Sequence, residues 1–288
     1  MALDDVMGLT DRLLTSAYAL AAMTARLRLA ELGNEGNPAL RAQLDRVADA
    51  LEARELYDAL DERDRSIVIA FARAYLRQAL ELVDDPARAP GWSYTDPALL
   101  QAQGSASAVV AHLISKAGVG SPDARILDVG TGVAGLAIAL CSTFPESTVV
   151  GLDPWEPSLA IARTNVAEAG LESRITLLDA AIQDFDDRDG FDLVWLPSFF
   201  IPESVLDRAI EQIHAVLRPG GTLVVGTTQT DEQSLDAAVD DLRTVRSGGS
   251  VVTATDARAR LERAGFADLR EPDLGMHVPL KLVVGTKP

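Results

Sequence analysis

Cysteine and histidine are scarce in this sequence of 288 residues, which contains one cysteine, Cys141, and three histidines. A single cysteine excludes a disulfide bond within the chain. The sequence also lacks a CxxC pair and an HExxH motif, so it offers no familiar ligand set for zinc, and we predict no metal cofactor. Nothing in the cysteine usage indicates an oxidising compartment.

Long hydrophobic runs are absent as well. No apolar run reaches the roughly 18 residues that a membrane-spanning helix needs. The initial segment, MALDDVMGLTDRLL, is acidic and amphipathic, and it lacks the basic region and small-residue cleavage site of a signal peptide. We therefore expect a cytoplasmic protein with no membrane partner.

Positive charge is in the minority, with 26 Lys and Arg residues against 43 Asp and Glu residues and a formal net charge of −17. Proteins bind the phosphate backbone of nucleic acids largely through Lys and Arg, so this charge disfavours a nucleic-acid partner. Apolar residues make up 48% of the chain, which is enough to form a sizeable core.

The first part of the chain, residues 1–90, is rich in Ala, Leu, Arg and Glu and has heptad-like apolar spacing. This pattern predicts a helical cap or dimerisation domain. We expect three helices: one that ends at Gly33–Pro38, one that continues through Tyr57 and Leu60, and one from Ser66 to Leu82. Apolar stripes of this extent are unusual on a monomer, so we also predict a homodimer.

The remainder, residues 91–288, begins with a linker and lead-in helix over 91–120, the helix running from about Ala106 to Ala117. Five β-rich runs follow, each separated from the next by a helical pattern: RILDVG, STVVGLD, RITLLD, FDLVWL and GTLVVGT. Such alternation predicts an α/β fold with a Rossmann-like, mostly parallel sheet. The final stretch, ADLREPDLGMHVPLKLVVGT, predicts two more strands without a helix between them, hence seven strands with an antiparallel last strand.

The segment RILDVGTGVAGLAIAL predicts a buried strand, a glycine turn and an apolar helix. Glycine lets the backbone turn sharply against a ligand, and the free N–H groups at the helix start favour polar or anionic groups. The pattern of Gly130, Gly132 and Gly135 also occurs in dinucleotide-binding folds. Asp128, however, would face a diphosphate badly, whereas it suits the ammonium group of an amino-acid-like ligand.

Two further acids follow the next two predicted strands. Asp153 lies about twenty residues after the glycine turn, where an acid binds ribose hydroxyls. Asp179 follows the third strand, where its carboxylate could accept a hydrogen bond from the exocyclic amine of an adenine. The N–H of Ala180 would then face the edge of the adenine ring. One acid at a strand end is usually a helix cap or a solvated turn residue. Three at one sheet edge indicate a site.

The motifs DVGTGVAG, GLDP, LLDAAIQDF, FDLVWL and LRPGG occur in the order found in class I S-adenosylmethionine-dependent methyltransferases, which the chain resembles from about Ala124 to Pro288. The resemblance implies S-adenosylmethionine as cofactor and a small-molecule acceptor. The N-terminal helices resemble the dimerisation region of small-molecule O-methyltransferases. The implied cofactor contacts are Gly130 and Gly132 to the methionine part, Asp153 to the ribose, Pro154 or Trp155 packed on the adenine, Asp179 and Ala180 at the adenine edge, and Leu196 and Pro197 near the sulfonium.

No catalytic residue follows from the resemblance. Phe199 holds the position at which plant-type enzymes carry a catalytic histidine, and the sequence LPSF lacks the polar first residue of amine-methylating enzymes. We expect proximity and orientation to supply most of the rate acceleration. The candidate acceptor-pocket residues are Trp92, Tyr94, Phe199 and Phe200, for which core packing is the alternative. Of the histidines, His112 is expected in the core, His214 in a structural role, and His277 before the last strand.

Three other functions remain open. An NAD-type Rossmann oxidoreductase explains the glycine turn and Asp153, but not Asp128, Asp179 or the antiparallel end of the sheet. A non-catalytic, regulatory protein that binds S-adenosylmethionine fits the missing base. A nucleic-acid methylase is disfavoured by the charge and by LPSF. The identity of the acceptor, and whether oxygen, nitrogen or carbon is methylated, stay open.

Overall fold

A computed structural model describes residues 2–33, 36–187, 190–227, 234–274 and 280–288. The chain divides into two compact units, Met1–Pro86 and Ala87–Pro288. Over the described residues, none of the helices combines the length and apolar character needed to cross a membrane. The same residues contain no group of three or more His, Cys, Asp or Glu side chains arranged to hold a metal ion.

The first unit is helical. Its elements are α1 (Ala2–Glu31), α2 (Pro38–Ala50), α3 (Arg54–Asp58) and α4 (Glu62–Asp84). Only the C-terminal half of α1 contributes to the core of this unit, through Met23 and Leu27. Arg26 bridges α1 to the next two helices, with ion pairs of 2.9 Å to Asp45 and 2.7 Å to Asp58.

The second predicted helix is in fact two helices. Glu52 adopts φ +52°, and the backbone N–H groups of residues 51–53 donate to the carbonyls of residues 47–49. A left-handed residue of this kind ends a helix, a role that glycine usually fills. The prediction of one continuous helix was wrong because Glu52 gives no local signal for that conformation.

The second unit contains a seven-stranded sheet in the order β3-β2-β1-β4-β5-β7-β6. Strands β1 to β5 are parallel to one another, and β7 is antiparallel to both of its neighbours, as predicted. The strands are β1 (Arg125–Val129), β2 (Thr148–Leu152), β3 (Ile175–Leu178), β4 (Phe191–Pro197), β5 (Leu217–Thr227), β6 (Ala267–Arg270) and β7 (Lys281–Thr286). LRPGG lies within β5 as a bulge, because the pairing shifts from Phe191 with Leu217 to Leu193 with Thr222.

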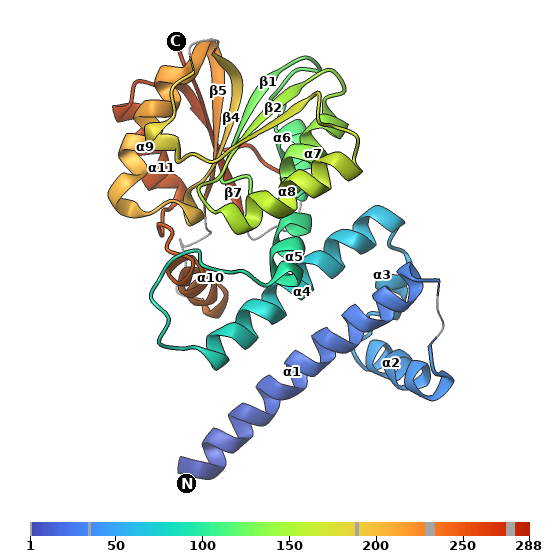
Figure 1. Ribbon diagram of the computed structural model, residues 1–288. Coiled ribbons are helices and arrows are strands. Elements are labelled where there is room, and N and C mark those ends of the chain that lie inside the picture. Colours follow the sequence, from blue (N-terminus) through green and yellow to red (C-terminus); the bar gives the residue numbers. More distant parts are fainter. Residues whose placement is uncertain (1, 34–35, 188–189, 228–233, 275–279) are drawn as a thin grey trace. The chain divides into compact units, whose positions relative to one another are not determined.

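Helices cover both faces of this sheet, with α9 and α11 on one face and α6, α7 and α8 on the other (Figure 1). The helical elements of the second unit are α5 (Pro97–Ser107), α6 (Val109–Lys116), α7 (Gly135–Thr143), α8 (Glu156–Glu168), α9 (Glu203–Val216), α10 (Leu235–Arg246), α11 (Ala254–Arg263) and the 3₁₀ turns η1 (Ile182–Asp184) and η2 (Ser198–Phe200). One core cluster of the described residues includes Leu127, Val194 and Ile213.

The lead-in helix begins earlier than predicted. It consists of α5 and α6, and α5 starts at Pro97 rather than near Ala106. Asp96 caps α5, because its carboxylate accepts a hydrogen bond of 2.9 Å from the N–H of Ala98. An Asp followed by Pro is a recognised helix start, so this correction was readable in the sequence.

Candidate active site

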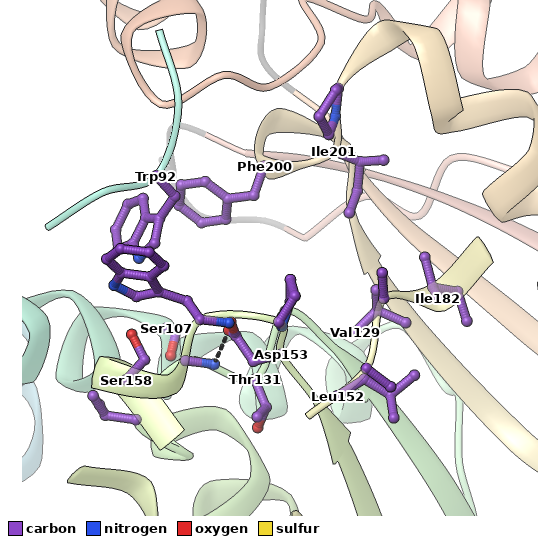
Figure 2. A pocket seen from close by; sticks show the side chains of 18 of the residues that line it. Trp92, Ser107, Val129, Thr131, Leu152, Asp153, Ser158, Ile182, Phe200 and Ile201 are labelled. Atoms are coloured by element: carbon purple, nitrogen blue, oxygen red, sulfur yellow. Dashed lines mark hydrogen bonds between the residues drawn. The ribbon is translucent and has the colours of Figure 1, made fainter. Parts of the chain in front are cut away.

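A pocket of about 380 Å³ lies at the carboxyl ends of β1 and β2, within the second unit. The chain continues from β1 to β2 on one side and returns to β4 on the other, so the pocket lies where the strand order reverses. Ligands of open α/β sheets bind at this point, and the volume is in the range of small-molecule sites. Figure 2 shows Trp92 and Phe200 beside each other, with Asp153 and Thr131 below them.

The glycine turn forms the floor of the pocket. Gly130 has φ +70° and Gly132 has φ +58°, a conformation that side chains disfavour. The N–H groups of Gly130 and Thr131 donate to the carbonyl of Leu152 at 2.8 and 2.9 Å, which fixes the turn to the end of β2. Both glycines line the pocket as predicted, so the backbone is open to a ligand there.

Asp153 lines the pocket beside this turn and is 7% exposed. Its Oδ2 accepts a hydrogen bond of 2.8 Å from the N–H of Gly132, and its Oδ1 accepts one of 2.8 Å from the N–H of Trp155. Burial raises the pKa of this carboxyl, the charge of Asp179 raises it further, and the two backbone donors oppose the increase. Further hydroxyl donors from a ligand would stabilise the carboxylate.

Asp128 lies deeper than expected. Its side chain is only 1% exposed and is not part of the pocket wall. Its Oδ2 accepts a hydrogen bond of 2.7 Å from the hydroxyl of Thr131, which does line the pocket. Burial raises the pKa of Asp128 to about 7. A ligand in the pocket would therefore meet Thr131 and not the carboxylate of Asp128 itself.

The aromatic candidates fall into two layers. Trp92 and Phe200 line the pocket, and their ring centroids are 5.1 Å apart. Tyr94 lies behind Trp92 at 5.0 Å, and Phe199 lies behind Phe200 at 4.9 Å. The prediction that all four face the acceptor is thus corrected. Successive side chains of the 3₁₀ turn η2 point about 120° apart, so its two phenylalanines cannot face the same space.

The other predicted cofactor residues divide into those that line the pocket and those that do not. Pro154, Trp155 and Ala180 line the pocket. Asp179 is exposed and does not, although residues 180–183 do. Leu196 is fully buried in the core on β4.

Pro197 is also buried and lies outside the pocket lining. Its Cγ is 3.7 Å from the position that a Cβ on Gly130 would occupy, so it supports the turn from behind. The alternating side chains of β4 pack between the sheet and its helices, which explains why neither Leu196 nor Pro197 opens to the pocket.

The structure adds lining residues that the sequence did not indicate. Thr131 and Gln183 come from the loops after β1 and β3. Residues Leu100, Gln103, Gly104 and Ser107 come from α5, and Ile201, Pro202 and Val205 follow η2. The cap at Asp96 was the signal that would have placed α5 here. Apart from Asp153, no ionisable side chain lines the pocket in the part of the chain that the structure describes.

Neither described histidine lines the pocket. His112 is exposed on α6, so the expectation of a core position was wrong. The sequence pattern VVAHLI is apolar on both sides of it, but His112 projects from the outer face of the helix. His214 packs edge-on against Phe266 at 5.0 Å, and burial lowers its pKa. His277 lies outside the described residues.

Comparison with known proteins shows which family this region resembles. Residues 126–221 match the sequence profile of a family described as "Methyltransferase domain". Over these residues the chain is similar to a methyltransferase domain, and it shares the Rossmann-like fold of solved methyltransferase structures. The matched region of this domain runs from β1 to the bulge in β5, so it contains the glycine turn, Asp153 and Ala180. Trp92 and α5 precede it.

Individual relatives resemble the methyltransferase domain or the whole chain. A demethylmenaquinone methyltransferase of Thermus thermophilus is 41% identical over 101 residues, which are 35% of this chain and 46% of the relative. The chain spans about half the length of the curated relatives it matches.

Two solved structures share the fold over nearly the full length. The S-adenosylmethionine-dependent methyltransferase SibL superposes with a TM-score of 0.64 at 23% identity, covering 96% of this chain and 98% of that chain. The mitomycin 7-O-methyltransferase MmcR superposes with a TM-score of 0.62 at 19% identity, covering 100% and 99%.

Proposed function

We propose that this protein transfers a methyl group from S-adenosylmethionine to a small-molecule acceptor, at oxygen. The observation that carries the proposal is the Asp153 carboxylate, which lines the pocket while bonded to the N–H of Gly132 in the glycine turn. A turn open to polar groups and an adjacent acid suit an amino-acid-like part and a ribose of one ligand.

The residues present fit S-adenosylmethionine. Asp153 has a buried, incompletely solvated carboxylate that hydroxyl groups would stabilise, and the indole of Trp155 offers an apolar surface for adenine. Gly130 and Gly132 leave room for the methionine part, and Ala180 lines the pocket where the edge of the adenine would lie. The ammonium group of the ligand suits a pocket whose wall residue Thr131 bonds to a second buried acid, Asp128.

The chemistry requires little from the protein beyond placement. The bound cofactor supplies an electrophilic methyl group on a sulfonium. With the cofactor bound, an acceptor oxygen in line with it would take the methyl group as the carbon–sulfur bond breaks, and the hydroxyl proton would pass to solvent. Trp92 and Phe200 hold the acceptor, and the apolar wall excludes water. Acceptors with an acidic hydroxyl suit a pocket without a base.

Calorimetry and turnover separate the competing functions. We expect S-adenosylmethionine and S-adenosylhomocysteine to bind and NAD not to bind, with methylation of at least one member of a panel of phenols. Binding of NAD alone would establish the oxidoreductase alternative. Cofactor binding without turnover on phenols, amines or carbon acids would favour a regulatory protein.

A homodimer in the cytoplasm completes the proposal. The N-terminal half of α1 exposes large apolar side chains, among them Leu3, Val6, Leu13 and Leu20. Val6, Leu13, Leu20 and the buried Leu27 stand seven residues apart, so one stripe continues from the core of the first unit onto the exposed half of the helix. A second copy of this helix is the partner that such a stripe suits.

The MmcR structure is a mitomycin 7-O-methyltransferase, which supports a small acceptor and methylation at oxygen.

A further inference from the structure

The segment Ala87–Asp96, here called the strap, carries Trp92 to the pocket wall. One end of the strap is fixed to the end of α10. The guanidinium of Arg88 donates to the hydroxyl of Tyr94 at 3.1 Å and to the carbonyl of Arg246 at 3.2 Å, and it lies 4.8 Å from the centre of the Tyr94 ring. Arg246 donates in return to the carbonyl of Arg88 at 2.9 Å.

Backbone contacts strengthen this end. The N–H of Gly91 donates to the carbonyl of Arg246 at 3.2 Å. Gly248 packs so closely on Gly91 that a Cβ there would lie 2.7 Å from the Cα of Gly91. The same turn bonds to η2, because the N–H of Ser250 donates to the carbonyl of Ser198 at 3.2 Å. The strap and the segment that carries Phe200 therefore share one support.

The other end of the strap is also bonded to Trp155. The indole N–H of Trp155 donates to the carbonyl of Tyr94 at 2.7 Å. The backbone N–H of the same residue donates to Asp153. One residue thus connects the proposed ribose-binding carboxylate to the strap, and its ring lines the pocket between them.

We propose that Trp155 is a positioning residue that couples cofactor occupancy to the order of the acceptor wall formed by Trp92 and Phe200. This inference rests on the proposed function. Ribose hydroxyls on Asp153 would fix the carboxylate and hence the backbone of Trp155. A ring packed on the indole would restrict its rotamers, so the bond to Tyr94 would cost less conformational entropy to form.

Ordering of the strap then favours binding of the acceptor. A restrained Tyr94 carbonyl holds Trp92 against Phe200, so the aromatic wall that the acceptor meets is better ordered when the cofactor is bound. Because coupling between binding sites is reciprocal, the acceptor also binds the cofactor-loaded protein more tightly than the free protein. The predicted order of binding is cofactor first, acceptor second.

Hydrogen exchange of backbone amides tests this inference without an acceptor. Peptides that cover residues 88–100 report on the strap, and peptides that cover residues 128–136 report on the glycine turn. Both are followed with and without saturating S-adenosylhomocysteine in wild type and Trp155→Phe, which keeps a ring but removes the indole N–H. The control is Trp195→Phe, because Trp195 of β4 is buried over Gly226 of β5 and does not line the pocket.

In wild type and Trp195→Phe, the ligand should slow exchange in both regions. In Trp155→Phe the glycine turn should still be protected, whereas the slowing in the strap should fall by about three- to tenfold, the effect of one hydrogen bond. Equal strap protection in Trp155→Phe and wild type would overturn the coupling. Protection of the turn but not the strap in wild type would do the same. Absence of any protection at the turn would instead count against the proposed function.

A second variant keeps the test decisive if Trp155→Phe does not fold. Arg88→Met removes the fixed anchor of the strap without touching the pocket lining. Amide exchange in the strap should be faster in the ligand-free variant than in ligand-free wild type. S-adenosylhomocysteine should then slow exchange in the strap by a larger factor in the variant than in wild type. A rise of the same size with and without the ligand would contradict the proposal, since Trp155 would then contribute nothing that depends on the cofactor.

Discussion

At the scale of single residues, the pocket separates acids that the sequence presents as equivalent. Asp128 is the penultimate residue of β1, and Asp153 and Asp179 directly follow β2 and β3, all at the same edge of the sheet. One is buried beneath the turn, one lines the pocket and one is exposed. Their expected effects on ligand binding and stability differ accordingly.

Asp153→Asn should weaken binding of S-adenosylhomocysteine. The amide keeps one acceptor for the backbone donors but lacks the charge and the second oxygen that would accept from ribose. A hydrogen bond lost from a buried group costs roughly 1–3 kcal/mol, or about five- to 150-fold in the dissociation constant. Calorimetry measures this loss, with Asp184→Asn as control because Asp184 is exposed and pairs with Arg208. Wild-type affinity in a folded Asp153→Asn protein would move the ribose site elsewhere.

Asp128→Asn should change how stability depends on pH. The pKa of Asp128 is about 7 in the folded protein against an ordinary value of 3.8. The folded state therefore holds the proton of Asp128 more tightly than the unfolded state does. The contribution of this proton to the free energy of unfolding is complete below pH 3.8 and is lost as the pH rises through 7. An amide has no proton to lose. The variant's free energy of unfolding, relative to wild type, should rise between pH 5 and pH 8 in urea titrations. A constant difference across this range would show that Asp128 is ionised throughout.

Catalysis should not depend on the described histidines. Since His112 is exposed and His214 packs on Phe266, His112→Ala and His214→Ala should retain turnover in folded protein. Loss of a general base would lower the rate about 10²- to 10⁴-fold. Single-turnover rates against pH should follow the ionisation of the acceptor hydroxyl instead. Abolished chemistry in either variant, with cofactor binding intact, would identify that histidine as the base.

At the scale of elements, the contact between α5 and the glycine turn leaves no space for a side chain. A Cβ on Gly135, the first residue of α7, would lie 2.0 Å from the carbonyl oxygen of Gly104. This neighbour is backbone and cannot rotate away, so α5 packs directly on the start of α7. The four lining residues of α5 depend on that contact for their place in the pocket.

Gly135→Ala should therefore destabilise the protein by about 1–3 kcal/mol or more, the usual cost of overpacking, and weaken cofactor binding. Thermal unfolding and calorimetry measure the two effects. The control is Gly8→Ala, where the nearest atom to the new Cβ is the end of the Arg12 side chain at 3.9 Å. That change should stabilise the protein, because alanine favours a helix by about 1 kcal/mol over glycine. Unchanged stability in Gly135→Ala would mean that α5 shifts without consequence.

At the scale of the whole molecule, the exposed half of α1 should govern assembly. Leu13 is 57% exposed in the middle of the stripe. Leu13→Asp should place a charge in the proposed helix–helix interface and convert the dimer to a monomer, with about half the mass by light scattering. Leu235→Asp is the matched control, because Leu235 is 74% exposed on α10. A wild-type mass that is monomeric at every concentration would exclude this interface.

The mostly parallel sheet with its antiparallel last strand and the place of the glycine turn followed from the sequence, because both rest on local patterns. Short apolar runs such as those that became β1 and β2 end in glycine or acid, and alternation with helices determines a parallel sheet. Asp153, Trp155 and Ala180 could be placed at one edge for the same reason, since the carboxyl ends of parallel strands meet there. The break at Glu52 escaped this reasoning because its left-handed conformation has no residue signature.

Only the tertiary structure decided which of these side chains reach the pocket. The burial of Asp128 under Thr131 depends on how the turn folds over β2, and the choice of Phe200 over Phe199 depends on the rotation of η2 against α10. The approach of α5 depends on the fit between Gly104 and Gly135, which are 31 residues apart. Sequence spacing determines the position of a residue along an element, but the direction of its side chain relative to a ligand is set by packing between elements distant in the chain.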